Sequence, residues 1–150
     1  MLKILIAEDE EPIANLIRVN LTRAGYGCTC ACDGEEAADQ MENGHFDLLL
    51  LDIMLPKING YELMEYAKTL QLPVIFITAM GTTEHKVKGL KMGAEDYISK
   101  PFEIVELLAR VETVLRRYTK IGKTIRGLDV EMDLSSRVVI QNGQQVLLTL

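Results

Sequence analysis

Short apolar runs alternate with longer amphipathic stretches along most of the chain. Each run has the length of a strand and is followed by apolar residues at helical spacing. Five such runs occur, at residues 4–7, 27–31, 46–51, 74–77 and 96–99. Strands that alternate with helices favour an α/β fold with a parallel sheet. We therefore predict a doubly wound sheet of five parallel strands with helices on both faces.

Local signals place the ends of several predicted helices. Pro12 fits the first turn of the first helix, and Gly25 ends that helix. Asp33, with Glu36 three residues later, resembles a capping box at the start of the second helix. The last helix has one apolar stripe, formed by Ile104, Leu107, Leu108, Val111 and Leu115.

The pattern changes after residue 118, and we divide the chain there. Residues 119–124 form a short linker, and residues 125–150 show β-like runs with a hairpin signal at Asn142 and Gly143. The last apolar run, residues 146–150, has no helix to cover it. We expect this tail to be the beginning of a truncated second domain.

Composition narrows the class of protein. With 150 residues, of which 48% are apolar, the chain has the size of one domain with an appendage. Its longest apolar runs are far shorter than the roughly 20 residues that cross a bilayer, and no signal peptide fits the first residues. We expect a cytoplasmic protein without membrane contact. The net charge of −6 argues against broad nucleic-acid binding by this chain.

Three cysteines, Cys28, Cys30 and Cys32, alternate along the predicted second strand and so point to one face. Side chains in a line do not converge on a metal ion, and a disulfide between strand neighbours would be strained. We interpret them as small buried apolar residues, with redox sensing as the alternative.

Polar residues gather where the predicted strands end. Glu8 and Asp9 follow the first strand, Asp52 follows the third, Thr78 the fourth and Lys100 the fifth. In a doubly wound sheet the ligand site lies beyond the carboxyl ends of the strands. The topology therefore predicts that these residues meet at one edge of the sheet.

Their chemistry suits phosphoryl transfer. Carboxylates that share a crevice need a cation between them, and hard oxygen ligands with room for water suit Mg²⁺. With the metal beside it, Asp52 can attack a phosphoryl group, while Lys100 and Thr78 hold the phosphoryl oxygens. Each residue taken alone has an ordinary interpretation, as a helix cap, a turn residue, filler or a solvated charge. Their combination at one edge favours function.

Four segments around these residues resemble a response-regulator receiver domain. They are residues 6–10 (Ile-Ala-Glu-Asp-Glu), 50–56 (Leu-Leu-Asp-Ile-Met-Leu-Pro), 77–79 (Ile-Thr-Ala) and 97–102 (Tyr-Ile-Ser-Lys-Pro-Phe). The resemblance covers residues 1–118, and it implies a flavodoxin-like sheet with the strand order 2-1-3-4-5.

The resemblance also implies a chemistry. Asp52 would accept a phosphoryl group from a sensor histidine kinase. Asp9, Asp52 and the backbone carbonyl of Met54 would bind Mg²⁺, and Glu8 would act mainly through water. Beyond this self-phosphorylation and a slow autodephosphorylation, we expect no enzymatic turnover.

A conformational switch is implied as well. Upon phosphorylation the hydroxyl of Thr78 would move to the phosphoryl group and Tyr97 would turn inward, changing the surface of the fourth helix, fifth strand and fifth helix. The resemblance further implies a cis peptide bond between Lys100 and Pro101.

Residues 125–150 resemble the strands that open the winged-helix DNA-binding domain of the OmpR family. The recognition helix is absent, so promoter DNA would be bound through the missing part of that domain. In that family the switch surface forms a symmetric homodimer through charge pairs. The residues at the matching positions are Lys86, Glu95, Asp96, Glu106, Arg110 and Arg117.

Two methionines lie close to the acceptor in sequence. Met54, two residues after Asp52, and Met80, two residues after Thr78, stand where some relatives carry polar groups. Neither side chain can orient an attacking water molecule. We therefore predict a long-lived phosphoryl state.

Three other classes of protein fit the sequence less well. Resemblance to the haloacid-dehalogenase-type phosphatases would put the nucleophile after the first strand, with a second Asp two residues later. Here Asp52 follows the third strand, and the residue two positions later is Met54. A flavin- or nucleotide-binding module needs a phosphate loop after that strand, where the acidic run at residues 8–11 would repel phosphate. A receiver-like domain that has lost phosphorylation is disfavoured because no member of the acceptor cluster is missing.

Overall fold

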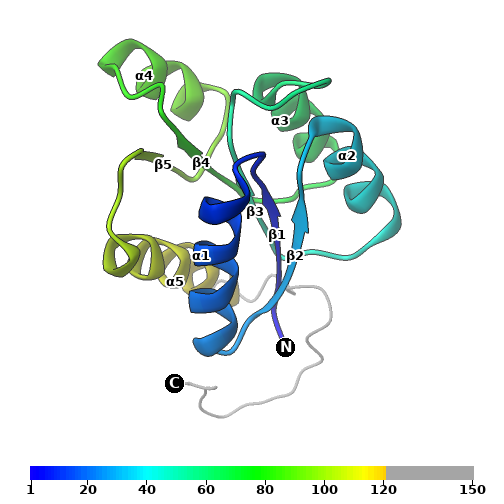
Figure 1. The fold of residues 1–150 in the computed structure, drawn as a ribbon, viewed down its shortest axis with the longest axis vertical. Coiled ribbons are helices and arrows are strands. Elements are labelled where there is room, and N and C mark those ends of the chain that lie inside the picture. Colours follow the sequence, from blue (N-terminus) through cyan, green and yellow to red (C-terminus); the bar gives the residue numbers. More distant parts are fainter. Residues whose placement is uncertain (121–150) are drawn as a thin grey trace.

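The computed structural model describes residues 1–120, in which strands and helices alternate (Figure 1). The strands are β1 (Lys3–Ala7), β2 (Gly27–Ala31), β3 (Leu48–Leu51), β4 (Val74–Thr78) and β5 (Asp96–Ser99). The helices are α1 (Glu11–Arg23), α2 (Gly34–Asn43), α3 (Gly60–Thr69), α4 (Thr83–Lys91) and α5 (Ile104–Lys120).

The sheet has the order β2-β1-β3-β4-β5, and every pair of neighbours is parallel. The predicted doubly wound sheet with the order 2-1-3-4-5 is confirmed. Strand β1 lies where the order reverses, between β2 and β3. Ala7 pairs with both Ala31 and Leu51, so Glu8 and Asp52, the next residues along β1 and β3, leave the sheet side by side.

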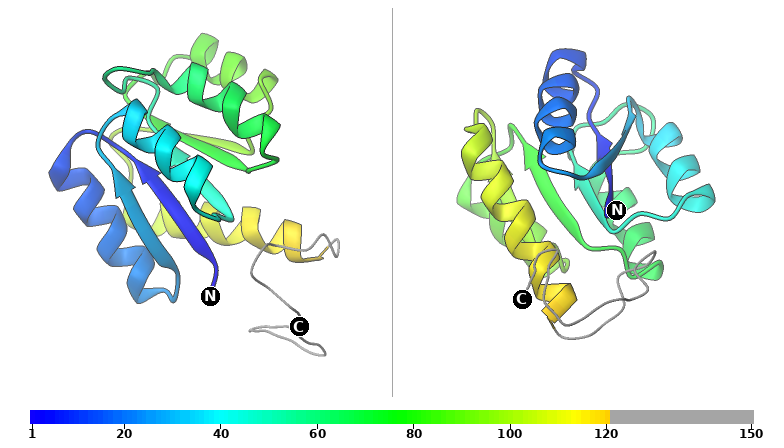
Figure 2. Two further views of the ribbon diagram at one scale, coloured as in Figure 1. Left: turned by 90° about the vertical axis from the view of Figure 1, so that its right-hand side faces the viewer. Right: turned by 90° about the horizontal axis from the view of Figure 1, so that it is seen from below.

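Helices cover both faces of the sheet (Figure 2). The core that includes Leu48 and Leu50 of β3 is completed by α1 and α5, and the core that includes Leu49 and Leu51 is completed by α2 and α3. None of these four leucines is more than 1% exposed. Burial on both faces explains why the sequence of this strand has no polar alternation.

Some predicted boundaries differ from the structure. The third strand begins at Leu48 rather than at residue 46. The residue before it, Asp47, uses its side chain as the acceptor for the backbone N–H of Lys3, at 2.9 Å. The capping box at α2 is only half formed. Asp33 accepts the Glu36 N–H at 2.7 Å, but the Glu36 carboxylate accepts the N–H of Cys32 instead of that of Asp33.

The C-terminal predictions fall largely beyond the described part. Helix α5 continues to Lys120, two residues past the predicted boundary at 118. The tail at 125–150 and most of the linker at 119–124 lie outside the described residues. Within residues 1–120, no helix is both long and apolar enough to cross a membrane.

Candidate functional site

Three carboxylates meet beyond the carboxyl ends of β1 and β3. Glu8, Asp9 and Asp52 each offer an oxygen, and these oxygens lie within 4.8 Å of one another. Glu8 and Asp52 are only 3% and 5% exposed, whereas Asp9 is exposed. Buried carboxylates at this spacing repel each other unless cations lie among them.

Lys100 supplies one of these cations. Its Nζ lies 2.9 Å from Oε1 of Glu8 and 2.9 Å from Oδ2 of Asp52. Burial opposes the charge on Lys100, but the hydrogen bonds to both carboxylates outweigh it and raise the pKa of the ammonium. For Glu8, burial is the largest effect, and it raises the pKa of the carboxyl although Lys100 opposes it.

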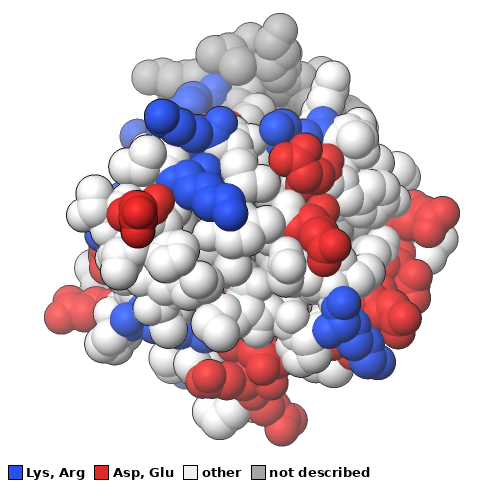
Figure 3. All heavy atoms as spheres, turned by 90° about the horizontal axis from the view of Figure 1, so that it is seen from above, with Lys and Arg blue, Asp and Glu red and all other residues white. Residues whose placement is uncertain are grey.

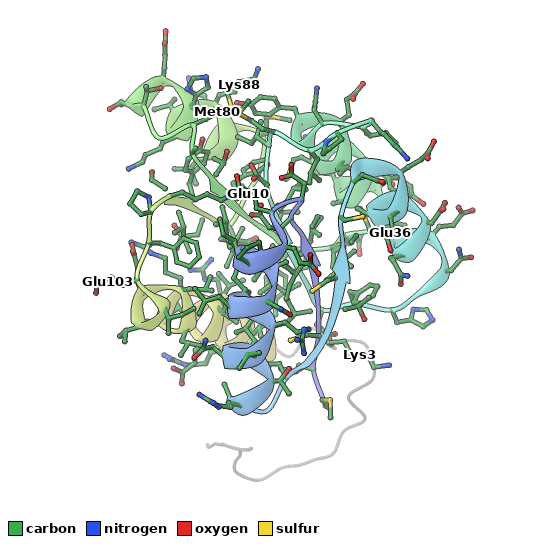
Figure 4. All side chains as sticks on the ribbon, in the orientation of Figure 1. Lys3, Glu10, Glu36, Met80, Lys88 and Glu103 are labelled. Atoms are coloured by element: carbon green, nitrogen blue, oxygen red, sulfur yellow. The ribbon has the colours of Figure 1, made fainter. Side chains whose placement is uncertain are left out.

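The backbone also orients the two buried carboxylates. Oδ1 of Asp52 accepts the N–H of Met54 at 3.1 Å, and Oε2 of Glu8 accepts the N–H of Glu10 at 3.1 Å. Asp52 therefore has one oxygen on Lys100 and the other on the backbone. Figure 4 shows Glu10, in the loop after β1, and Met80, before α4, at the same end of the molecule.

The acidic cluster fits a hard divalent cation. Three carboxylates that converge within a few ångströms, one of them open to solvent, provide oxygen ligands and leave room for water, which is the donor set that Mg²⁺ prefers. One lysine cannot balance three carboxylates, so a bound divalent ion would neutralise the rest of the cluster.

Thr78 and Tyr97 both meet Met80. The fully buried Thr78 hydroxyl accepts the N–H of Met80 at 3.3 Å, and the Tyr97 hydroxyl donates to the carbonyl of Met80. The Tyr97 ring packs on Phe76 with the centroids 5.8 Å apart. Burial, with smaller contributions from Tyr61 and Asp52, raises the pKa of Tyr97 to about 12. Tyr97 thus lies inward, on the side of the sheet that α4 covers.

The charges predicted for a dimer interface form pairs within the chain. Arg110 of α5 lies 2.8 Å from Asp96 and 3.2 Å from Glu106, and Arg117 lies 2.7 Å from Glu95. Lys86 is exposed on α4. None of these residues belongs to the acidic cluster. They lie instead along α4, β5 and α5.

The surface carries charges of both signs. In the face seen in Figure 3, several basic side chains gather at the upper left, and acidic side chains are spread over the rest of the face among uncharged ones.

The cysteines are less buried than predicted. Cys28 and Cys30 are half-buried and pack against the core under α1, but Cys32 is exposed. The reason is that β2 ends at Ala31, so Cys32 lies in the following turn, where its thiol donates to Glu36. The interpretation as buried apolar residues is wrong for Cys32.

Sequence reasoning missed Gly60, whose backbone packs directly against the backbone of Asp52 and Ile53. Its N–H donates to the carbonyl of Ile53 at 2.7 Å. A Cβ at Gly60 would lie 2.5 Å from Cα of Ile53 and 2.7 Å from the carbonyl oxygen of Asp52. The available signal was a glycine in the first turn of a helix, where a close backbone approach is one of the few reasons to tolerate it.

Comparisons with known proteins agree with this geometry. Residues 4–112 match the model of the response regulator receiver domain. The class of protein that the fold and the site define is therefore the response regulator. The chain belongs to the response regulator receiver domain family.

The most similar relatives include transcriptional regulators. The chain is 40% identical to the transcriptional regulatory protein CusR of Escherichia coli K12 over 152 residues, covering 99% of this chain and 67% of CusR. It is 40% identical to the response regulator ArlR of Staphylococcus aureus Mu50, covering 99% of this chain and 68% of ArlR. The chain thus spans about two thirds of the length of these relatives.

Solved receiver domains share the fold. The receiver domain of the Francisella response regulator 1452 is 35% identical, with a TM-score of 0.74 over 78% of this chain and 98% of that one. The BeF3-activated DrrB receiver domain is 33% identical, with a TM-score of 0.72 over 78% of this chain and 99% of that one.

Proposed function

We propose that Asp52 accepts a phosphoryl group from a sensor histidine kinase in a reaction that requires Mg²⁺. The observation that carries this proposal is the buried Asp52 carboxylate, bound by Lys100 and within 4.8 Å of Glu8 and Asp9. A buried nucleophilic carboxylate with a neighbouring cation and a metal-binding donor set suits phosphoryl transfer.

Glu8, Asp9, Asp52 and the backbone carbonyl of Met54 would hold the ion, Glu8 mainly through water. Bound Mg²⁺ neutralises charge on the phosphoryl oxygens and on the carboxylates. Oδ1 of Asp52 hydrogen bonds to the Met54 N–H, so the backbone fixes the plane of the attacking carboxylate.

In the transfer, one oxygen of Asp52 forms a bond to phosphorus while the bond from phosphorus to the histidine nitrogen of the donor breaks. The electron pair of that bond returns to the imidazole. Lys100, which is bound to the Asp52 carboxylate before the transfer, then donates to the new phosphoryl oxygens. The Thr78 hydroxyl donates to one of these oxygens as well. Apart from this step and slow hydrolysis, the protein turns nothing over.

The signal then passes from the site to the surface. When Thr78 turns toward the phosphoryl group, it leaves the Met80 N–H, and the inward position of Tyr97 is coupled to that loop through the Met80 carbonyl. We propose that the surface of α4, β5 and α5 changes in consequence and controls homodimerisation through Lys86, Glu95, Asp96, Glu106, Arg110 and Arg117.

The output of the whole protein is proposed to be transcription. Residues 1–118 would form the receiver domain, residues 119–124 the linker, and residues 125–150 the beginning of a winged-helix domain that binds promoter DNA when complete. CusR of Escherichia coli K12, of which the chain covers 67%, is named as a transcriptional regulatory protein, which supports the assignment. A protein that receives its phosphoryl group from a kinase and then binds promoter DNA would work in the cytoplasm.

Intact mass after treatment with acetyl phosphate tests the proposal. With Mg²⁺, the chain should gain one phosphoryl group, and Asp52→Ala should gain none. Chelation of the metal should abolish the gain as well. A folded wild-type chain that gains no mass would contradict the proposal.

A further inference from the structure

The loop between β3 and α3 makes a strained turn beside the acceptor. The N–H of Ile58 donates to the carbonyl of Pro56 at 2.9 Å, which closes a three-residue turn around Lys57. Lys57 has a φ of 74°. A turn of this kind is rare for a residue with a side chain, and it persists only where neighbouring structure holds it.

The N-terminus of α2 holds this turn. The N–H of Gly34 donates to the same Pro56 carbonyl at 2.9 Å. This oxygen therefore accepts two backbone hydrogen bonds, one from its own loop and one from α2. The two backbones touch closely. A Cβ at Gly34 would lie 2.0 Å from the carbonyl oxygen of Ile58, which no side chain could share.

An ion pair adds to this contact. Nζ of Lys57 lies 3.4 Å from Asp33, the residue that caps α2, and 3.5 Å from Glu35. Exposed ion pairs contribute little to stability, so these pairs favour the turn without being its main support. We call Asp33, Gly34 and Lys57 the α2 clamp.

The loop is fixed at its other end too. Gly60 binds the carbonyl of Ile53 at 2.7 Å, which closes the base of the loop. Met54 lies between this base and the clamped turn, and its N–H is bound to Asp52. The peptide that follows Met54 therefore lies between two fixed points of the loop.

We propose that the α2 clamp positions the Met54 carbonyl as a ligand of the divalent cation, with Gly34 and Lys57 as positioning residues that never touch the ion. This inference rests on the proposed function. Groups that orient metal ligands from outside commonly change the metal affinity about tenfold or more when they are mutated.

Mn²⁺ binding, followed by the electron paramagnetic resonance signal of the free ion, tests the clamp directly. Gly34→Ala should weaken Mn²⁺ binding about tenfold, because the loop must move away from the new Cβ. The matched control is Gly27→Ala at the far end of β2, whose Cβ would meet only side-chain atoms of Met1 and Lys3. The control should bind Mn²⁺ as the wild type does.

A second pair of variants does not depend on the folding of Gly34→Ala. Lys57→Ala should weaken Mn²⁺ binding roughly two- to threefold, and Lys57→Arg, which keeps the charge for Asp33, should restore it. With acetyl phosphate, Gly34→Ala should raise the Mg²⁺ concentration that gives the half-maximal rate, while the rate at saturating Mg²⁺ stays near that of the wild type.

Two results would overturn the inference. One is wild-type Mn²⁺ affinity in a folded Gly34→Ala together with wild-type affinity in Lys57→Ala. The other is a loss of affinity in Gly27→Ala as large as that in Gly34→Ala, which would show a general effect of destabilisation. If the wild type itself bound no Mn²⁺, the proposed function would fail first and the inference with it.

Discussion

Lys100 illustrates how much one side chain can decide in this site. It separates two carboxylates that are almost completely buried, at 2.9 Å from each. Lys100→Met should therefore lower the free energy of unfolding by on the order of 3 kcal/mol without divalent ions, because both carboxylates lose their cation. Mg²⁺ should recover more stability in this variant than in the wild type. Urea denaturation with and without Mg²⁺ measures both effects, and equal recovery would argue against a shared electrostatic role.

Single residues should also set the lifetime of the proposed phosphoryl group. Met54 is 62% exposed beside Asp52, and Met80 follows Thr78. Because neither thioether orients water, Met54→Asn combined with Met80→Glu should speed dephosphorylation on the order of tenfold, a part of what a well-placed base supplies. The decay of the phosphorylated mass measures this, with Leu16→Asn at an exposed position of α1 as the control. An unchanged decay rate would mean that access of water, rather than its orientation, limits hydrolysis.

The raised pKa of Tyr97 predicts that the free energy of unfolding depends on pH in the alkaline range. Its folded-state pKa of about 12 lies above its ordinary value of 10.0, so the folded protein holds the phenol proton more tightly than the unfolded chain. The stability linked to this proton is complete below pH 10 and is lost as the pH rises through 12. Tyr97→Phe should lose less stability across this window than the wild type. Urea denaturation at several pH values measures the difference, and parallel curves would contradict it.

At the scale of elements, β3 is buried along its whole length, and its side chains alternate between the two cores. Leu50 is 1% exposed and belongs to the core under α1 and α5. Leu50→Ala should cost about 2–5 kcal/mol of unfolding free energy, because it leaves a cavity between packed layers. Leu16→Ala is the control. The Leu16 side chain on α1 is 49% exposed, so its removal should change stability little. Similar losses in both variants would mean that α1 is covered by another surface.

The sequence predicted elements whose identity depends on local pattern. A buried strand needs a continuous apolar run, so β4 could be located to within a residue, and Pro12 and Gly25 correctly bracketed α1. The short strand β5 was also placed correctly, although only its two central residues are apolar. The site residues could be grouped because the ends of parallel strands meet at one edge. The order of the strands, by contrast, came from the family resemblance and not from periodicity.

Contacts between distant loops were beyond such reasoning. Nothing in the residues around Lys57 indicates a positive φ, since the turn is held by Gly34, which belongs to another element. The half-formed capping box has a more local cause. Because β2 ends at Ala31, the N–H of Cys32 donates to the Glu36 carboxylate four residues along the chain. Likewise, spacing alone could not tell whether Arg110 and Arg117 pair within the chain or across a dimer.

At the scale of the whole molecule, the charges beside β5 and on α5 would have two sets of partners in the proposed dimer. Within one chain, Arg117 pairs with Glu95 at 2.7 Å, and Glu95 also accepts the hydroxyl of Tyr118. The Arg117 side chain is 50% exposed and that of Glu95 is 22% exposed, and ion pairs with an exposed partner are weak, so this pair can exchange partners at little cost. The proposed symmetric dimer would offer the same residues from the second copy, so pairs between the two copies would compete with the pairs within each copy.

This competition predicts how the dimer responds to charge reversal. Arg117→Glu should weaken the dimer of the phosphorylated chain several-fold, since like charges then face each other across the interface. Combining it with Glu95→Arg should restore the dimer, because the reversed pair forms equally well in either direction. Sedimentation of phosphorylated samples measures the dissociation constants, and added salt should weaken the wild type and the double variant alike. If the double variant dimerised no better than Arg117→Glu alone, these two residues would not face each other across the interface, and the dimer would have to use another surface.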